Sequence, residues 1–295
     1  MYESEGESMR YLTKEWYGLS QCTGLHFGMR AHKGAGQKDE ALYLRLYKRK
    51  EREFIKKEHE IYNVNPRYML DVAGSVFIPA DKFLSDDEIC EEDKIVYEMP
   101  SEEKERIYRL IEEYDSREPF DVNEYRIKFS KIQDILSRDN AEKLPEELYS
   151  QIADHRVFTL GYCTKEILKQ LKSYSIKNNK KVHNALEEYT KAQQEQDIPE
   201  ELKKQFGFHD CVVVNCKVDR DVEISFNSSN GFSEFKKVVF QDAKIIKQEK
   251  SLEGSIWLYE ELYCSQNGYE AHILFASDLS HELTISCKDI ILGKG

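Results

Sequence analysis

The chain has 295 residues, of which 40% are hydrophobic and 33% are charged, and its formal net charge at pH 7 is −12. A chain of this length can bury a substantial core in one or two domains. The excess of acidic residues extends over both the part before residue 206 and the part after it. This charge balance disfavours nucleic acid and anionic membranes as partners, because both are bound by basic surfaces.

Targeting segments and cysteine usage favour a cytoplasmic protein. Residues 1–8 are acidic and lack the apolar stretch of a signal peptide, so we expect them to form a disordered extension. No run of 18 apolar residues could form a transmembrane helix. The seven cysteines are scattered, as is typical of reduced thiols. Only Cys211 and Cys216 are close, and a Cys-x4-Cys spacing without a second pair predicts neither a metal site nor a cofactor.

Apolar residues recur at helical spacing up to about residue 205. Asp39 is placed to cap a long helix that ends near Tyr62, and Ser101 is placed to begin another. The segment Asp121–Glu124 resembles a capping box. Residues 24–36 contain four glycines and are predicted to form a mobile loop. Further helices are expected from Pro145, from Thr164, around Val182–Tyr189 and from Pro199.

After Phe206 the apolar residues alternate, as they do in strands. Asn267-Gly268 is a strong signal for a hairpin turn. The sequence therefore predicts an α+β protein, with a helical domain over 9–205 and an antiparallel β-meander domain over 206–295 that forms a rolled sheet, a small barrel or a sandwich. The expected strands cover 212–218, 222–226, 236–240, 243–248, 255–264, 269–276 and 281–291.

The segment Arg10-Tyr-Leu-Thr-Lys-Glu-Trp-Tyr17 resembles the opening of an uncharacterised family of Firmicutes proteins. That family typically begins with Met, a basic residue, Tyr, Phe and Thr-Lys-Glu-Trp-Tyr, and Leu12 stands here in place of the Phe. The resemblance implies a cytoplasmic bacterial protein with a helical part and a β part. Because the family is a domain of unknown function, the resemblance supplies no catalytic residues. Further segments that fit it are Leu46-Tyr47, Gln151–Val157, Thr164–Ile167, Phe208–Cys211 and Leu252–Glu261.

The pair His209-Asp210 invites comparison with HD phosphohydrolases, in which helices gather His and Asp around a metal. Here strands follow the pair, so the sequence favours a structural role at the junction between the last helix and the first strand.

The strand over 255–264 offers a second candidate surface. Regular alternation would place Trp257, Tyr259, Glu261 and Tyr263 on one face, and Leu258, Glu260 and Leu262 on the other. The aromatic face could bind a ligand or a peptide, and the alternative is ordinary cross-strand aromatic packing. His272 would form an acid–base or metal pair with Glu260 if the two share a face and a register.

No nucleophile elbow occurs in the sequence. We therefore favour a non-catalytic cytoplasmic bacterial protein that binds an unknown protein or small ligand. The alternative is a hydrolase with a site at the junction of the helical and β domains, built from His209, Asp210 and either Glu261 or His272. Trp16 is expected to dock into the helical core and Trp257 to pack in the β domain. The candidate binding residues are Trp16, Tyr17, His209, Asp210, Trp257, Glu261 and His272.

Overall fold

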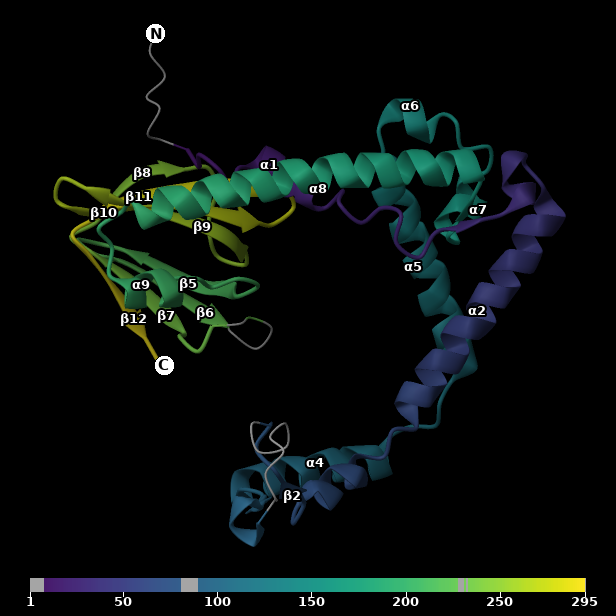
Figure 1. Cartoon of the computed structure of the whole chain (residues 1–295), viewed down its shortest axis with the longest axis horizontal. Helices are drawn as coiled ribbons and strands as arrows, with labels where there is room; N and C mark the ends of the chain where they lie inside the picture. The colour runs from purple at the N-terminus through teal and green to yellow at the C-terminus, as the bar shows by residue number, and fades with distance from the viewer. Residues whose placement is uncertain (1–7, 81–89, 228–230, 232, 295) are drawn as a thin grey trace. The chain divides into compact units, whose positions relative to one another are not determined.

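The computed structural model of the chain describes residues 8–80, 90–227, 231 and 233–294 (Figure 1). They form two units. The strand unit comprises Met1–Ala31, Lys143–Gln151 and Thr164–Gly295, and the helical unit comprises His32–Glu142 and Ile152–Cys163. The extension expected over 1–8 lies outside the described residues except for Ser8. The Ser8 hydroxyl accepts a hydrogen bond of 2.8 Å from the Lys247 ammonium.

The expected α+β class is confirmed, and one sheet of eight antiparallel strands dominates the strand unit. The alternating pattern after Phe206 places every strand of this sheet downstream of residue 211. The strands occur in the order β12-β7-β6-β5-β9-β10-β11-β8. Their bounds are β5 Val212–Val218, β6 Val222–Asn227, β7 Lys237–Gln241, β8 Lys244–Gln248, β9 Ile256–Ser265, β10 Gly268–Ala276, β11 Ser280–Cys287 and β12 Asp289–Gly293.

The sheet consists of two three-stranded meanders, β5-β6-β7 and β9-β10-β11, which meet where Val212 pairs with Ile256. The fourth strand of each half crosses to the other half, so β8 pairs with β11 and β12 pairs with β7. Only Lys288 separates β11 from β12, and this short link forces the sheet to fold back on itself. Figure 1 shows the two halves as two layers. The sheet is thus rolled but not closed into a barrel, and the single strand expected over 281–291 is wrong.

The inner face of the rolled sheet carries the core of the strand unit. Trp257 is fully buried there, with its ring centroid 5.3 Å from that of Phe275 and 5.6 Å from that of Phe226. Phe206 and Phe208, which follow helix α9 (Glu200–Gln205), complete the aromatic group at 5.8 and 5.2 Å from Trp257. These two phenylalanines enter the core between α9 and β5, where the chain changes from helix to strand, and this explains the change of apolar period in the sequence.

The outer face of β9 and β10 is covered by two helices, α1 (Lys14–Ser20) and α8 (Lys165–Gln194), as Figure 1 shows. Thr164 caps α8 as expected, but α8 is one helix of 30 residues rather than the two predicted from residues 164 and 182. Trp16 is 6% exposed, and its indole N–H donates a hydrogen bond of 3.2 Å to the Val182 carbonyl. Trp16 therefore docks against α8 and the sheet together.

The domain limit at residue 205 stays a prediction. The change from helix to strand does occur between α9 and β5, but α1 and α8 pack with the sheet, and both belong to the strand unit. Limited proteolysis tests the limit, and cleavage within 203–208 that leaves an intact β fragment is the expected result.

The helical unit is built around α2 (Glu40–Tyr62) and α5 (Val122–Lys143). The Asp39 carboxylate accepts a hydrogen bond from the Leu42 N–H and caps α2 as predicted. Leu42 and Leu46 of α2 form an apolar cluster with Phe129 of α5. Ala35 of the short helix η1 (Lys33–Gly36) is also buried in this cluster, and the mobility expected over 24–36 stays a prediction. The remaining elements of this unit are η2 Pro66–Val72, β2 Val76–Phe77, η3 Glu91–Asp93, β3 Ile95–Val96, α4 Ser101–Ser116, α7 His155–Thr159 and β4 Tyr162–Cys163.

The predicted start of α4 at Ser101 and the aspartate that precedes α5 are both found. The Asp121 carboxylate accepts a hydrogen bond of 2.8 Å from the Asn123 N–H, as expected of a capping residue. The short elements of the strand unit are β1 Arg30–Ala31 and α6 Glu146–Tyr149. None of the described helices is both long enough and apolar enough to cross a membrane.

Candidate functional site

All seven candidate residues lie in the strand unit, and a bulge in β9 decides which face Trp257 takes relative to Glu261. Tyr259 pairs with Leu274 and Trp257 pairs with Phe275, so Leu258 between them has no partner on β10. One extra residue reverses the alternation. Trp257 therefore faces the core, and the predicted shared face of Trp257 with Tyr259, Glu261 and Tyr263 is wrong.

Glu260 shares the inner face with Trp257. The Trp257 indole N–H donates a hydrogen bond of 2.7 Å to Glu260 Oε2. Burial raises the pKa of the Glu260 carboxyl to about 7, although the Trp257 hydrogen bond acts in the opposite direction. Because Trp257 is fully buried, it is a core residue and not a contact for a ligand.

Glu261 lies on the outer face, where its carboxylate holds the start of the chain. Glu261 Oε1 accepts hydrogen bonds from the Tyr11 and Leu12 N–H groups at 2.7 and 2.6 Å. Oε2 accepts from the Arg10 N–H at 2.8 Å and from the Tyr263 hydroxyl at 2.7 Å. The side chain is fully buried. Four donors occupy the carboxylate, so Glu261 is a clamp for the segment before α1 and has no oxygen directed at solvent.

His272 lies directly across from Glu261 in the sheet register and is also fully buried. Its Nε2 is 2.7 Å from Glu270 Oε1, and its ring packs edge-on against Tyr263 with centroids 5.4 Å apart. The expected pair of His272 with Glu260 is wrong, because Glu260 is opposite Ile273 and faces the core.

Three of the remaining candidates have rings around Tyr259, with Trp16 on its buried side. The Tyr259 ring is 4.8 Å from Trp16, 6.2 Å from Tyr17 and 5.1 Å from His209, measured between centroids. His209 Nδ1 is 3.2 Å from Asp210 Oδ2, and these two side chains are 41% and 45% exposed. We call Tyr17, His209, Asp210 and Tyr259 the surface cluster.

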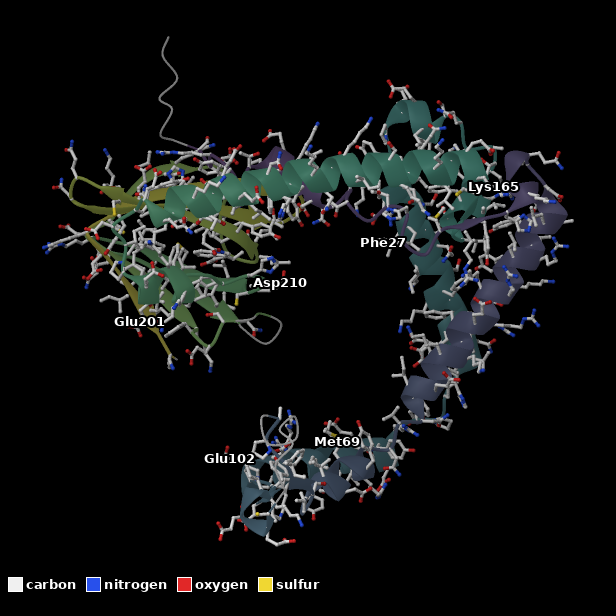
Figure 2. The ribbon with its side chains drawn as sticks, viewed as in Figure 1. Phe27, Met69, Glu102, Lys165, Glu201 and Asp210 are labelled. Atoms are coloured by element: carbon white, nitrogen blue, oxygen red, sulfur yellow. The ribbon has the colours of Figure 1, made fainter. Side chains whose placement is uncertain are left out.

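The backbone of Asp210 is held in an unusual conformation. Its φ is +64°, in the left-handed region that non-glycine residues rarely adopt. Its N–H donates a hydrogen bond of 3.0 Å to the Trp257 carbonyl, which fixes the turn before β5. Figure 2 labels Asp210 beside the strands. Strained backbone of this kind is often found at functional sites, although Asp242 has a similar φ of +48° in the turn between β7 and β8.

The arrangement does not bring a catalytic set together. Glu261 and His272 are buried on the outer face of the sheet under other groups, whereas His209 and Asp210 are half exposed. Among the residues that the structure describes, no three His, Cys, Asp or Glu side chains could hold a metal ion. Burial raises the pKa of the Cys163 and Cys287 thiols to about 11 and about 12, which suppresses their nucleophilic thiolate forms.

A polar pocket in the helical unit was not predicted from the sequence. Its volume is about 220 Å³, and α2, α5 and α7 each contribute to its wall. The residues that line the pocket come from three segments far apart in the chain, so no local sequence pattern predicts the pocket. Two segments that fit the resemblance described above reach it, since Leu46-Tyr47 contributes Tyr47 and Gln151–Val157 contributes Arg156. The other lining residues are Tyr43, Tyr47, Gln133, Asp134, Ser137 and Thr159.

A family model described as a protein of unknown function, DUF4085, matches residues 103–287. The chain belongs to the DUF4085 family. The matched region runs from α4 to the end of β11 and so includes parts of both units. It contains His209, Asp210, Trp257 and the residues around them, whereas the opening segment with Trp16 and Tyr17 lies before it. No match was found to a curated protein or to a solved structure.

Proposed function

We propose that this DUF4085 protein is a non-catalytic cytoplasmic binding protein that recognises a protein partner through the surface cluster. The proposal is supported by how the candidate residues are used. Glu261 holds the N-terminal segment, His272 lies against Glu270, and Trp257 fills the core, so none of the three is available to a partner. The surface cluster is the part of the candidate set that a partner can reach.

The observation that carries the proposal is the position of Tyr259. Its ring contacts Trp16 on the buried side, while Tyr17 and His209 lie beside it at the surface. A partly buried aromatic group next to an imidazole and a carboxylate is typical of interaction hot spots, because packed side chains lose little conformational entropy on binding. The Asp210 carboxylate and the net charge of −12 favour a partner that presents a basic side chain at this point.

The cytoplasmic location rests on the odd number and scattered spacing of the cysteines. A hydrolase built from the same residues is less well supported, because an acid–base pair must lie within hydrogen-bond reach in an accessible cleft. The described positions of Glu261 and His272 do not provide that geometry with His209 and Asp210.

The test compares two aspartates in the same strained backbone conformation. Asp210→Gly combined with His209→Ala removes the polar half of the surface cluster, and glycine at a positive φ relieves strain rather than adding it. Asp242→Gly makes the matched change at a distant turn. Tagged wild-type protein, the double variant and Asp242→Gly are used to capture partners from native cytoplasm. Each captured protein is then purified and its affinity measured.

We expect one partner that wild type and Asp242→Gly bind equally well and that the double variant binds at least about tenfold more weakly, as loss of a hot-spot contact implies. Crosslinks from the partner should map to Tyr17 or Tyr259. Equal affinity of all three proteins for every purified partner would reject the surface cluster as the binding site.

A further inference from the structure

A pocket in the strand unit, which we call the turn pocket, lies where three turns of the rolled sheet meet. These turns join β7 to β8, β9 to β10, and β11 to β12. The volume of the turn pocket is about 620 Å³. None of its lining residues belongs to the surface cluster. The residues that line it are Asp242, Lys244, Asn267, Ser286, Cys287 and Lys288.

Backbone contacts hold the three turns together. The Lys288 N–H donates a hydrogen bond of 2.8 Å to the Gln241 carbonyl, which ties the link between β11 and β12 to the end of β7. Gly268 has a φ of +137° and packs so closely on the same link that a Cβ atom there would lie 2.3 Å from the Cys287 carbonyl oxygen. This close approach fixes the Asn267-Gly268 hairpin beside Lys288. The turn pocket is therefore built on a backbone that three separate segments hold in place.

The lining contains four hydrogen-bond donors that the described part of the chain leaves unused. They are the ammonium groups of Lys244 and Lys288, the Ser286 hydroxyl and the Asn267 side-chain amide, and none of these groups makes a hydrogen bond or an ion pair with a described residue. Lys244 is opposite Ser286 in the register of β8 and β11, so their side chains lie on the same face of the sheet. All four residues are at least partly exposed, so a ligand from solvent can reach these donors.

The charge of the lining is positive. Asp242 is the only acid among the described lining residues, and the Arg220 guanidinium pairs with its carboxylate at 3.2 Å. The neighbouring acid Glu270, which is opposite Ser286 on β10, is also engaged, since its Oε1 is 2.7 Å from His272 Nε2. The charges of the two lysines are therefore not neutralised by the carboxylates around them. In a chain with a net charge of −12, this set of unpaired cations and unused donors favours an anionic ligand.

We propose that the turn pocket binds the phosphate group of a small molecule. Two ammonium groups match the charge of a phosphate monoester, which approaches −2 above a pH of about 6. Lysine is a common phosphate ligand because its ammonium acts as a point charge with three donors. A phosphate group presents three acceptor oxygens, so the Ser286 hydroxyl and the Asn267 amide have acceptors in addition to those used by the lysines.

The size of the turn pocket leaves space for the organic part of such a ligand. A water molecule takes up about 30 Å³ of liquid, so 620 Å³ exceeds what the five heavy atoms of a phosphate group require. The net charge of the whole chain does not prevent binding, because salt screens charges beyond about 8 Å at physiological ionic strength. This site does not depend on the function proposed for the surface cluster.

The experiment is isothermal titration of the full chain at a pH of about 8, where the phosphate group is dianionic. The probes are glycerol phosphate, glycerol as its neutral counterpart, and acetate as an anion with a single charge. We expect glycerol phosphate to bind with 1:1 stoichiometry and glycerol to give no measurable binding. Acetate should bind at least about tenfold more weakly than glycerol phosphate, because it offers one negative charge to two ammonium groups.

Four variants locate the site. Lys244→Gln and Lys288→Gln each remove one charge from the lining and should each weaken glycerol phosphate binding about tenfold or more, as loss of a charge-assisted contact implies. Asp242→Asn should instead strengthen binding about threefold, since it removes the acidic residue of the lining and asparagine tolerates the φ of +48°. Lys236→Gln is the matched control, because this exposed lysine does not line the turn pocket, and binding should stay within about twofold of wild type.

Folding of each variant is checked by its melting temperature, which should equal that of wild type because all four positions are exposed. The backbone amide resonances of Asn267 and Lys288 provide a second readout, since glycerol phosphate should shift them and glycerol should not. Equal weakening by all three lysine variants, acetate binding as tight as that of glycerol phosphate, or no saturable heat at millimolar glycerol phosphate would each overturn the proposal. Sedimentation of the chain with vesicles of phosphatidic acid that Lys288→Gln abolishes would overturn the choice of a small, soluble ligand.

Discussion

Each face of strand β9 carries one glutamate side chain, and the two carboxyl groups differ in their hydrogen-bond donors. Glu260 on the inner face accepts a hydrogen bond from the Trp257 indole N–H, and burial raises the pKa of the Glu260 carboxyl to about 7. Glu261 on the outer face receives three backbone N–H groups and the Tyr263 hydroxyl. The inner carboxyl is therefore easily protonated, whereas the outer one acts as an acceptor for four donors.

The difference reflects the structural role of each face of the sheet. The inner face is an apolar core in which an acid is tolerated beside one indole. The outer face is a docking surface for the start of the chain, where Glu261 fixes Arg10–Leu12 and so places Trp16 against α8. An N-terminal segment stays ordered only when something ties it down, and Glu261 provides that tie.

The largest expected effect is on the inner face. Trp257→Ala should lower the free energy of unfolding by about 4–5 kcal/mol, because it empties a fully buried site among four phenylalanine rings and removes the donor to Glu260. Urea unfolding followed by circular dichroism measures it. A loss below about 2 kcal/mol would mean that the core closes around the cavity, which a rigid rolled sheet should not allow.

The matching change on the outer face is Trp16→Ala. We expect a loss of about 3–4 kcal/mol, somewhat smaller because Trp16 is 6% exposed and lies at the edge of the unit. The same unfolding experiment measures it. If stability is unchanged and partner binding is abolished, Trp16 is a recognition residue rather than an anchor. The binding surface would then include α1 as well as the surface cluster.

Removing the outer carboxylate should cost less than removing either tryptophan. Glu261→Gln replaces one acceptor oxygen by an NH2 group that opposes the donors of Arg10 and Tyr263, and the loss should be about 2–3 kcal/mol. Hydrogen exchange at the Tyr11 and Leu12 amides should accelerate in this variant. The control is Glu188→Gln at an exposed position of α8, which should leave exchange at both amides as in wild type.

Ionisation of the Glu260 carboxyl should make the stability of the protein depend on pH. Its folded pKa is about 7 against 4.5 for an ordinary glutamate, so the folded state resists its ionisation. Below pH 4.5 the group is protonated in both states and costs nothing, and stability is then lost as the pH rises through about 7. Glu260→Gln cannot ionise and should exceed wild type by about 2 kcal/mol at pH 8, within the limit of about 3 kcal/mol set by the shift.

Unfolding free energies at pH 4.5, 6 and 8 measure this difference. Exposed Glu253 supplies the control, since Glu253→Gln should follow wild type at all three values. A gain from Glu260→Gln that is as large at pH 4.5 as at pH 8 would show that the inner carboxyl is not the titrating group.

Local signals in the sequence predicted local structure well. Asp39 and Thr164 cap the helices assigned to them, and the alternating apolar residues gave six of the eight strands within one or two residues. These features depend on near neighbours in the chain, which the sequence displays directly. The class α+β followed from them, because a helical period before Phe206 and a strand period after it leave few other architectures.

The faces of the strands were not predictable in the same way. Regular alternation predicts Trp257 on the same face as Tyr259, but the single bulged residue Leu258 moves Trp257 to the opposite face. The crossing of β8 and β12 depends on pairings between distant strands. The polar pocket likewise combines residues from three helices, and no local sequence pattern at Gln133 or Arg156 predicts it.

The smallest effect should come from the charged edge of the outer face. The Lys14 ammonium is 2.5 Å from Glu249 Oε2, and these side chains are 31% and 29% exposed. Burial alone would raise the pKa of Glu249, but hydrogen bonds from Lys14, the Glu282 N–H and Lys247 outweigh it and hold the pKa at about 2. A depressed pKa stabilises the fold above pH 4.5, and that contribution is lost as the pH falls from 4.5 towards 2.

Because solvent screens the pair, Lys14→Ala should lower the free energy of unfolding by less than about 1 kcal/mol at pH 7. The difference from wild type should shrink towards zero at pH 2.5, since Glu249 is then partly protonated. Lys56→Ala removes a more exposed lysine that pairs with Glu60, and it should be neutral at both pH values. A Lys14→Ala loss that is as large at pH 2.5 as at pH 7 would mean that Lys14 acts through its aliphatic packing on the sheet and not through the charge of Glu249.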